Sequence, residues 1–317
     1  MKLIIVSPAA QNSTLGNSIT ADRWAKISRA LGHEVSVANE WTGEPCDTLI
    51  ALHARRTYSS IERFRQAYPE RPLVVALTGT DLYDDLPESR EARHSVDLAT
   101  RVVVLQSAAL HALAGDIRAK TCVIYQSAVP PAQRPGVASD RFDVCVLSHL
   151  REVKDPLRVA LASRLLPDIS KIRIIHAGRA LDPKWDELAR REERENFRYQ
   201  WVGEQSHEAA MELLASCQLF VLPSTMEGGA NAIAEAVVCG VPVLCSQIPG
   251  NAGMLDLNYP GCFRVGDTEQ LAHMLHRAET DSGFIRELRD IIQSIKERFS
   301  PVQELTRWKE LLGTFQL

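Results

Sequence analysis

The chain has 317 residues, 45% of them hydrophobic and 24% charged, and a formal net charge of −4. These values are typical of a soluble globular protein and exclude the broad positive field of proteins that bind nucleic acids or anionic membranes. The seven scattered cysteines form no Cys-x-x-Cys pair, which indicates reduced thiols in a cytoplasm and neither a disulfide framework nor a zinc site. The length predicts two domains, and no segment approaches the roughly 20 apolar residues of a membrane span.

Short apolar segments alternate with helix-forming segments in the first part of the chain. The helical pattern from Ser18 places Ile19, Trp24 and Ile27 on one face and ends at Gly32. The predicted strands are KLIIVS (2–7), HEVSVA (33–38), DTLIALH (47–53), PLVVAL (72–77), RVVVLQ (101–106) and TCVIY (121–125). Continuous apolar strands with crossover helices predict a parallel sheet that is buried on both faces.

The same pattern begins again near Phe142, after a proline-rich stretch over 129–136 that breaks both helix and strand. The second set of strands is FDVCVLS (142–148), IRIIHAG (172–178), FRYQWVG (197–203), LFVLP (219–223), PVLCS (242–246) and CFRV (262–265). Helices follow at 267–280, 284–299 and 302–315. The fold class is therefore α/β, with Rossmann-like, doubly wound domains at 1–135 and 136–301 that have ligand sites beyond their strands' carboxyl ends.

The strand at 219–223 leads into the most informative segment of the chain. A loop with Glu227, Gly228 and Gly229 precedes a short helix at 231–239, which carries Glu235. Glycine lets backbone N–H groups approach an oxyanion closely, and the start of the helix turns its N–H groups and positive dipole end to the same point. A pocket with phosphate on the backbone and hydroxyl groups on two acids fits a nucleoside diphosphate sugar.

This segment resembles the retaining glycosyltransferases of family four, which have the two-domain GT-B architecture and an E-x7-E motif. The resemblance implies that Glu227 contacts the donor sugar and Glu235 the ribose. It implies a diphosphate on the Gly228–Gly229 backbone, beside Ala230 and Asn231. It also implies two domains facing a cleft and a last helix, 302–317, that packs back on the first domain through Trp308, Leu311 and Leu312. Neither a cofactor nor a metal ion is expected.

Two further loops of the second domain extend the predicted donor site. The family has Gly-Arg-Leu-x-x-x-Lys after the first strand of this domain, and here Lys154 matches the lysine while His149 replaces the arginine. Arg151 is the side chain that could take over that charge. Cations here would stabilise a departing diphosphate. The loop at Gly203 and Glu204 corresponds to the family's nucleotide-base region.

The first domain is expected to bind the acceptor. Its first helix begins after Gly16 and Asn17, where the family has a glycine pair near the reacting phosphate, and helix capping is the structural alternative. Another strand ends in His53, Arg55 and Arg56, and guanidinium groups hold phosphate oxygens in bidentate fashion. The next strand ends in Thr80 and Asp81, which we expect to face the same site.

Several signatures together resemble a narrower group, the bacterial selenosugar synthases of selenoneine biosynthesis. The signatures are Gly-Asn-x-x-Thr-Ala-x-Arg-Trp-Ala (16–25), Ala-Leu-His-Ala-Arg-Arg (51–56), Leu-Thr-Gly-Thr-Asp-Leu-Tyr (77–83), His-Leu-Arg-Glu-Val-Lys-Asp-Pro (149–156), Glu-Gly-Gly-Ala-Asn (227–231) and Trp308-x-x-Leu-Leu. This resemblance implies UDP-N-acetylglucosamine as donor and selenophosphate, a small anion, as acceptor. The alternatives are a family-four enzyme acting on a hydroxyl acceptor, a sugar-nucleotide epimerase of the same architecture, and a non-catalytic sugar-nucleotide sensor.

Overall fold

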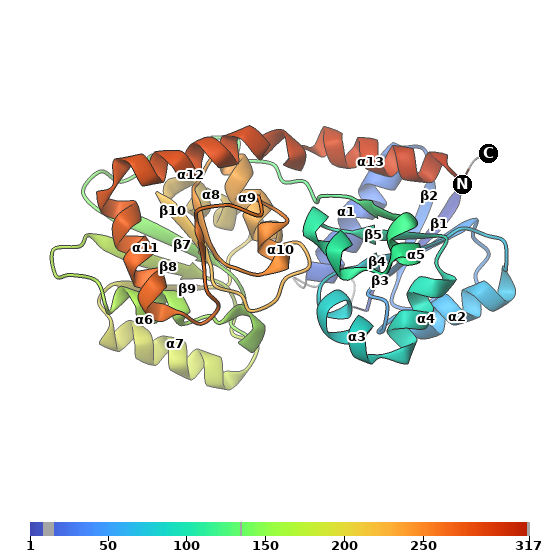
Figure 1. The fold of residues 1–317 in the computed structure, drawn as a ribbon, viewed down its shortest axis with the longest axis horizontal. Helices are drawn as coiled ribbons and strands as arrows, with labels where there is room; N and C mark the ends of the chain where they lie inside the picture. Colours follow the sequence, from blue (N-terminus) through green and yellow to red (C-terminus); the bar gives the residue numbers. More distant parts are fainter. Residues whose placement is uncertain (9–15, 134, 316–317) are drawn as a thin grey trace. The chain divides into compact units, whose positions relative to one another are not determined.

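A computed structural model describes residues 1–8, 16–133 and 135–315 of the chain (Figure 1). The chain forms two compact units, of which the first comprises Met1–Gln126, Glu227–Gly229 and Pro301–Leu317. The second comprises Ser127–Met226 and Ala230–Ser300. Each unit contains one six-stranded parallel sheet, as the apolar strands predicted. Among the helices that the structure describes, none combines the length and the apolar character that crossing a membrane requires.

The first unit has strand order β2-β1-β3-β4-β5-β6. Its elements are β1 (Lys2–Val6), α1 (Gly16–Ala30), β2 (Glu34–Ala38), β3 (Thr48–Leu52), α2 (Tyr58–Ala67), β4 (Leu73–Leu77), the π-helix η1 (Asp81–Asp85), α3 (Leu86–Glu88), α4 (Arg90–Leu98), β5 (Arg101–Val104), the 3-10 helix η2 (Ser107–Ala112), α5 (Gly115–Ala119), β6 (Thr121–Val123) and α13 (Pro301–Gly313). Helices α1 and α13 lie on one face of the sheet, and α2 and α4 lie on the other (Figure 1).

The last helix is held to the first sheet by aromatic packing. Trp308 of α13 and Trp24 of α1 are fully buried, with ring centroids 4.7 Å apart. Leu311 and Leu312 belong to the same core cluster, which contacts β1, β3, β4 and β5. The Trp24 indole N–H also donates to the buried carboxylate of Glu304 at 3.1 Å. Because α13 supplies part of this core, residues from both ends of the chain build the first unit.

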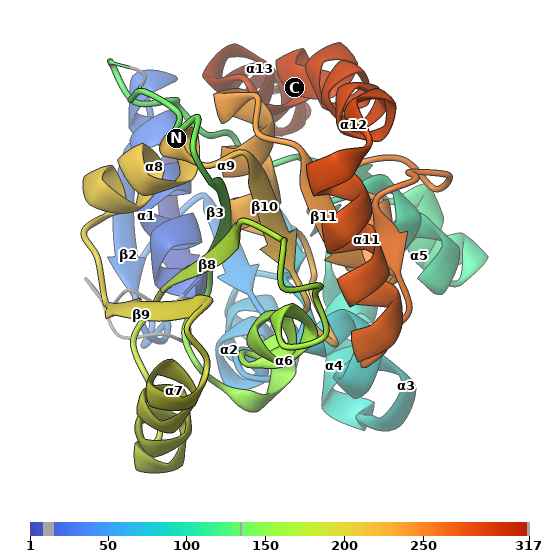
Figure 2. The ribbon, with the colours of Figure 1, turned by 90° about the vertical axis from the view of Figure 1, so that its left-hand side faces the viewer.

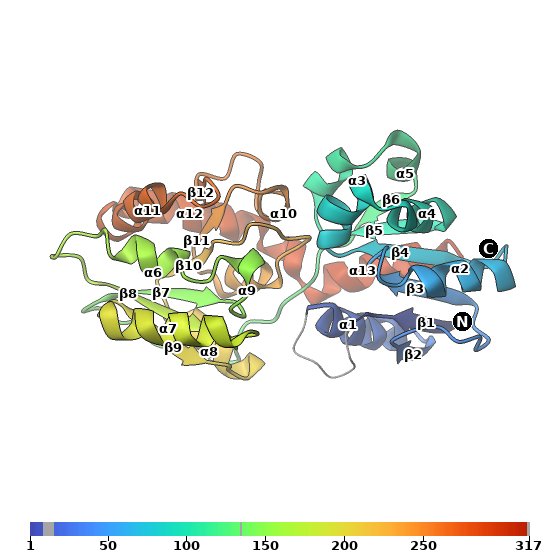
Figure 3. The ribbon, with the colours of Figure 1, turned by 90° about the horizontal axis from the view of Figure 1, so that it is seen from below.

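The second unit has strand order β12-β11-β10-β7-β8-β9. Its elements are β7 (Phe142–Leu147), the 3-10 helix η3 (Glu152–Lys154), α6 (Arg158–Ser163), β8 (Ile172–Ala177), α7 (Pro183–Glu195), β9 (Tyr199–Gly203), α8 (His207–Ser216), β10 (Leu219–Leu222), α9 (Asn231–Cys239), β11 (Val243–Ser246), α10 (Pro249–Ala252), β12 (Cys262–Phe263), α11 (Thr268–Thr280), α12 (Ser282–Ile295) and the 3-10 helix η4 (Lys296–Phe299). Helices α8, α9 and α12 lie on one face (Figure 2), and α6 and α7 on the other, nearest the viewer in Figure 3.

The first segment of the first unit ends at Gln126, where the sequence predicted residue 135, and its last segment begins at Pro301, where the sequence predicted residue 302. The N–H of Ala128 donates to the carbonyl of Phe299 at 3.1 Å, which fastens the chain after Gln126 to the second unit. The proline-rich stretch therefore begins inside the second unit. Helix α1 also begins at Gly16, before the predicted Ser18.

Candidate active site

The strand order of the second unit reverses between β7 and β10, which pair in parallel. Ligands of such sheets bind beyond the carboxyl ends of the strands at this reversal. The loop after β7 contains the predicted Arg151, which is exposed, and Lys154, which is partly buried in the turn η3. The backbone N–H of Thr225, in the loop after β10, donates to the carbonyl of Val153 at 2.9 Å. The fold therefore brings these two loops together and fixes the turn that carries Lys154.

The loop after β7 is also fixed to the loop after β8. His176, fully buried on β8, has Nε2 3.0 Å from the carbonyl of Ser148 and Nδ1 3.0 Å from the Tyr199 hydroxyl. Burial lowers the pKa of His176 to about 4, so the imidazole is neutral near pH 7 and donates from Nε2 to the carbonyl. The N–H of Arg179 donates to Nδ1 of His149 at 3.2 Å, so His149 helps to hold the loop after β8.

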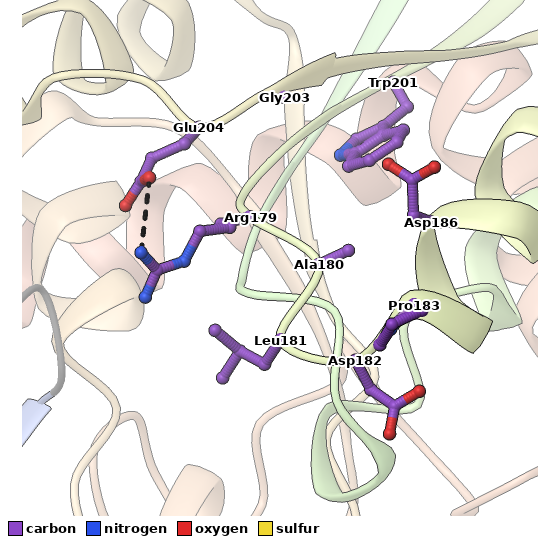
Figure 4. A pocket seen from close by; sticks show the side chains of 9 residues that line it. All are labelled: Arg179, Ala180, Leu181, Asp182, Pro183, Asp186, Trp201, Gly203 and Glu204. Atoms are coloured by element: carbon purple, nitrogen blue, oxygen red, sulfur yellow. Dashed lines mark ion pairs between the residues drawn. The ribbon is translucent and has the colours of Figure 1, made fainter.

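A pocket of about 400 Å³ lies beyond β8 and β9 (Figure 4). It is lined by Arg179, Ala180, Leu181, Asp182, Pro183, Asp186, Trp201, Gly203 and Glu204. The indole N–H of Trp201 donates to the carbonyl of Gly178 at 2.8 Å. Nη1 of Arg179 forms an ion pair with Oε2 of Glu204 at 3.9 Å. Gly203 and Glu204, which the sequence placed at the donor site, thus line this pocket. Sequence reasoning missed Arg179, although its position directly after a strand's carboxyl end was a usable signal.

Helix α9 matches the predicted range of 231–239 and ends at Gly240, whose φ is 69°. Glu235 lies on this helix with 16% of its side chain exposed, and its Oε1 is 3.8 Å from Nδ1 of His207, at the start of α8. Asn231 is the first helical residue, after a buried Ala230. The segment Glu227–Gly229, with a partly buried Glu227, groups with the first unit by contacts.

In the first unit, His53 occupies an unusual place at the carboxyl end of β3. Its φ of 76° is left-handed, a conformation that costs a non-glycine residue about 1–3 kcal/mol and is common at functional sites. Nδ1 accepts from the N–H of Arg56 at 3.3 Å, which leaves Nε2 to donate to the Thr80 hydroxyl at 3.0 Å. Burial lowers the pKa of His53, so this neutral form is favoured.

The two adjacent arginines have different surroundings. Nε of Arg55 forms an ion pair of 2.8 Å with Asp85, while Arg56 is exposed. Gly16 and Asn17, at the start of α1, follow β1, which neighbours β3 in the sheet. The fold therefore brings His53, Arg55 and Thr80 together, and it places Gly16 and Asn17 after the neighbouring strand.

Asp81 does not face an open site. It is fully buried, and its carboxylate accepts from the N–H groups of Ala54 at 3.0 Å and of Thr78 and Gly79 at 2.8 Å each. Burial raises the pKa of this carboxyl group, while His53 and the three N–H donors oppose the shift. We therefore revise the expectation that Asp81 contacts the acceptor: its side chain builds the turn that places Thr80.

Comparison with known proteins decides the family. The model of "Glycosyl transferases group 1" matches residues 132–298, which is more than half of the chain. The chain belongs to this family. The glycosyltransferase is similar in structure to HepE from Anabaena in complex with UDP and glucose, with a TM-score of 0.77 and 19% identity over 99% of this chain and 100% of that chain.

Two other solved structures are similar to the glycosyltransferase. Sucrose-phosphate synthase from Thermosynechococcus elongatus has a TM-score of 0.75 and 14% identity over 99% of this chain and 98% of that one. A TarM mutant from S. aureus, in complex with fondaparinux, α-GlcNAc-glycerol and UDP, has a TM-score of 0.63 and 15% identity over 85% of this chain and 55% of that one. The predicted enzyme class and GT-B fold are confirmed. Among the described residues, no group of three His, Cys, Asp or Glu side chains could hold a metal ion.

Proposed function

We propose that this glycosyltransferase transfers N-acetylglucosamine from UDP-N-acetylglucosamine to the selenium of selenophosphate. The electron pair of the bond between the anomeric carbon and the diphosphate oxygen leaves with UDP. A lone pair of selenium forms the new carbon–selenium bond, and hydrolysis of the selenium–phosphorus bond then releases phosphate. Selenium in selenophosphate is already a strong nucleophile, so no dedicated general base is required and the neutral His53 need not accept a proton. Metal ions and cofactors have no role in this proposal.

The donor half of the proposal is carried by the contact between Thr225 and Val153. This hydrogen bond fixes the turn of Lys154 where the second sheet reverses. Lys154, with Arg151, would stabilise the charge that develops on the departing diphosphate. The complexes of HepE with UDP-glucose and of TarM with UDP support a uridine donor, and α-GlcNAc-glycerol in the TarM complex supports the sugar.

The remaining donor contacts follow the family's motif. Glu227 would hold the sugar, and Glu235 the ribose hydroxyls. The diphosphate would accept hydrogen bonds from the backbone at Gly228 and Gly229 and at the start of α9, where N–H groups and the helix dipole favour an anion. The base would enter the pocket at Gly203 and Glu204.

The acceptor half rests on the cluster after β3 and β4. Thr80 accepts a hydrogen bond from His53, so its own hydroxyl hydrogen points elsewhere and would be donated to an anionic oxygen. The exposed Arg56 and the half-exposed Arg55 supply guanidinium groups at the same strand end. A small, highly charged acceptor fits this set better than a neutral hydroxyl compound.

Release of UDP from UDP-N-acetylglucosamine tests the proposal. We expect release that depends on selenophosphate, and a product that shows the isotope pattern of selenium in mass spectrometry. The Lys154→Met variant should lose this turnover and serves as the enzyme control. Turnover with hydroxyl acceptors alone would overturn the choice of acceptor. Exchange of sugar protons without release of UDP would favour an epimerase.

A further inference from the structure

The residue that follows Lys154 has a backbone conformation that its side chain does not favour. Asp155 has φ 43° and ψ 56°, in the left-handed region, and ends the turn η3. Outside glycine this region is energetically unfavourable, although aspartate tolerates it better than most residues. Only His53 and Asp155 show positive φ among the non-glycine residues that the structure describes. The direction in which Lys154 leaves the turn therefore depends on a conformation that other contacts must hold.

The N–H of Asp155 donates to the Glu152 carbonyl at 2.9 Å, and the contacts to its side chain and its carbonyl come from one arginine. Nε of Arg158 lies 2.7 Å from Oδ2 of Asp155, and the backbone N–H of Arg158 donates to the Asp155 carbonyl at 3.1 Å. Nη1 of Arg158 donates to the Thr268 hydroxyl, at the start of α11, at 2.6 Å. The Asp155 and Arg158 side chains are only 21% and 24% exposed, so the ion pair is better shielded from water than a surface pair.

The turn of Lys154 is thus held from two sides. Thr225 binds the Val153 carbonyl from the loop after β10, and Arg158 ties Asp155 to α11. All of these residues belong to the second unit. A 3-10 turn of three residues has little rigidity of its own, because it closes on few hydrogen bonds.

We propose that Arg158 is a positioning residue for Lys154, which it holds by fixing the left-handed conformation of Asp155 and anchoring it to Thr268. This inference rests on the proposed role of Lys154 at the donor diphosphate. In this proposal Arg158 acts through Asp155 and Thr268 and is not itself a ligand of the diphosphate. Its loss would let Asp155 relax towards right-handed or extended conformations and would turn Lys154 away from the phosphates.

UDP affinity is the primary readout, because calorimetric titration with UDP needs no acceptor. We expect the Lys154→Met variant to weaken UDP binding about tenfold, the factor that corresponds to about 1.4 kcal/mol. Arg158→Gln should weaken it several-fold, and Arg158→Lys, which keeps the charge but lacks the fork that reaches two partners, should lie between. The variant Arg307→Gln is the matched control, because Arg307 forms an i,i+3 pair with Glu310 at 3.0 Å on α13.

A double-mutant cycle separates positioning from general destabilisation. Glycine adopts the left-handed conformation without help, so Asp155→Gly makes the arginine dispensable: Arg158→Gln in that background should weaken UDP binding little further. Thermal unfolding of each variant, followed by circular dichroism, checks the fold. An equal effect of Arg158→Gln in both backgrounds would overturn the inference, as would unchanged affinity in Arg158→Gln while Lys154→Met binds weakly. Unchanged affinity in Lys154→Met would instead refute the donor role of the lysine.

Discussion

Gly178 is a position at which one added methyl group should directly disturb the candidate donor site. A Cβ at this residue would lie 1.9 Å from the carbonyl oxygen of Ser148 and 2.5 Å from its carbon, where real Cβ contacts are essentially never below 3.0 Å. Both obstacles are backbone atoms, and the Ser148 carbonyl is held by the buried His176. No side-chain rotation can relieve the clash, so the ends of β7 and β8 must move apart.

The required displacement is about 1 Å, and it falls on contacts that build the pocket. The N–H of Leu150 donates to the Arg179 carbonyl at 2.9 Å, and that of Leu181 donates to the Leu150 carbonyl at 3.1 Å. Both bonds join the loops after β7 and β8. Forced overpacking costs about 1–3 kcal/mol, and misplacement by about 1 Å can cost about 100-fold in rate. We expect Gly178→Ala to lower the unfolding free energy by about 1–3 kcal/mol. We also expect it to weaken UDP binding at least about tenfold.

Calorimetric titration with UDP and urea unfolding followed by circular dichroism measure the two effects. Gly43→Ala is the matched control: Gly43 has φ 117°, but nothing lies within 4 Å of its added Cβ, so it reports backbone strain without a clash. A Gly178→Ala variant that binds UDP as tightly as the parent protein would refute the link between this clash and the pocket. Equal loss of UDP affinity in both variants would show that strain, and not displacement of the pocket loop, is responsible.

Three further predictions concern stability and the acceptor. Trp24→Phe should lower the unfolding free energy, measured with urea, by about 3 kcal/mol more than Trp308→Phe does. The reason is that Trp24 donates to a buried carboxylate, while Nε1 of Trp308 is buried without a partner among the described residues. Equal losses of unfolding free energy in the two variants would contradict this. Because the pKa of His176 is depressed, its contribution to stability is fully present above about pH 6.5 and is lost as the pH falls towards about 4. The variant His176→Gln should therefore flatten the fall in unfolding free energy at acid pH, by at most about 3 kcal/mol. An unchanged fall at acid pH would contradict this. Replacing both Arg55 and Arg56 with glutamine should raise KM for selenophosphate about tenfold or more and leave UDP affinity unchanged, whereas an unchanged KM would favour a neutral acceptor.

Local chemistry made much of the second unit predictable. The helix at 231–239 could be placed from the sequence because Gly240 supplies the left-handed cap that ends it and the flanking segments are uniformly apolar. The strands needed no tertiary information, since parallel strands buried on both faces consist of continuous apolar residues. The juxtaposition of the loops at Lys154 and Thr225 followed from strand order alone once the reversal point was known.

Contacts between residues distant in sequence were beyond prediction. Thr268 lies 110 residues after Arg158, and no local pattern indicates that the two side chains meet. Asp81 shows a different limit. A polar residue after a strand can face solvent or turn under the backbone, and the choice depends on N–H groups from Ala54 as well as from its own turn. The sequence predicted that Asp81 faces the acceptor site, whereas its carboxylate is fully buried.

The charges of the first unit bear on which arginine serves the acceptor. Arg55 already forms an ion pair with Asp85, so its charge adds little to the positive potential at this strand end. Burial lowers the pKa of His53, so this neutral side chain adds no positive charge either. An incoming anion would have to compete with Asp85 for Arg55, whereas Arg56 is exposed. Because a carboxylate so close offsets most of the charge of Arg55, the attraction for the proposed acceptor, selenophosphate, should come mainly from Arg56, with Thr80 supplying direction. The cluster therefore suits an acceptor that brings several negative charges and can draw Arg55 away from its partner.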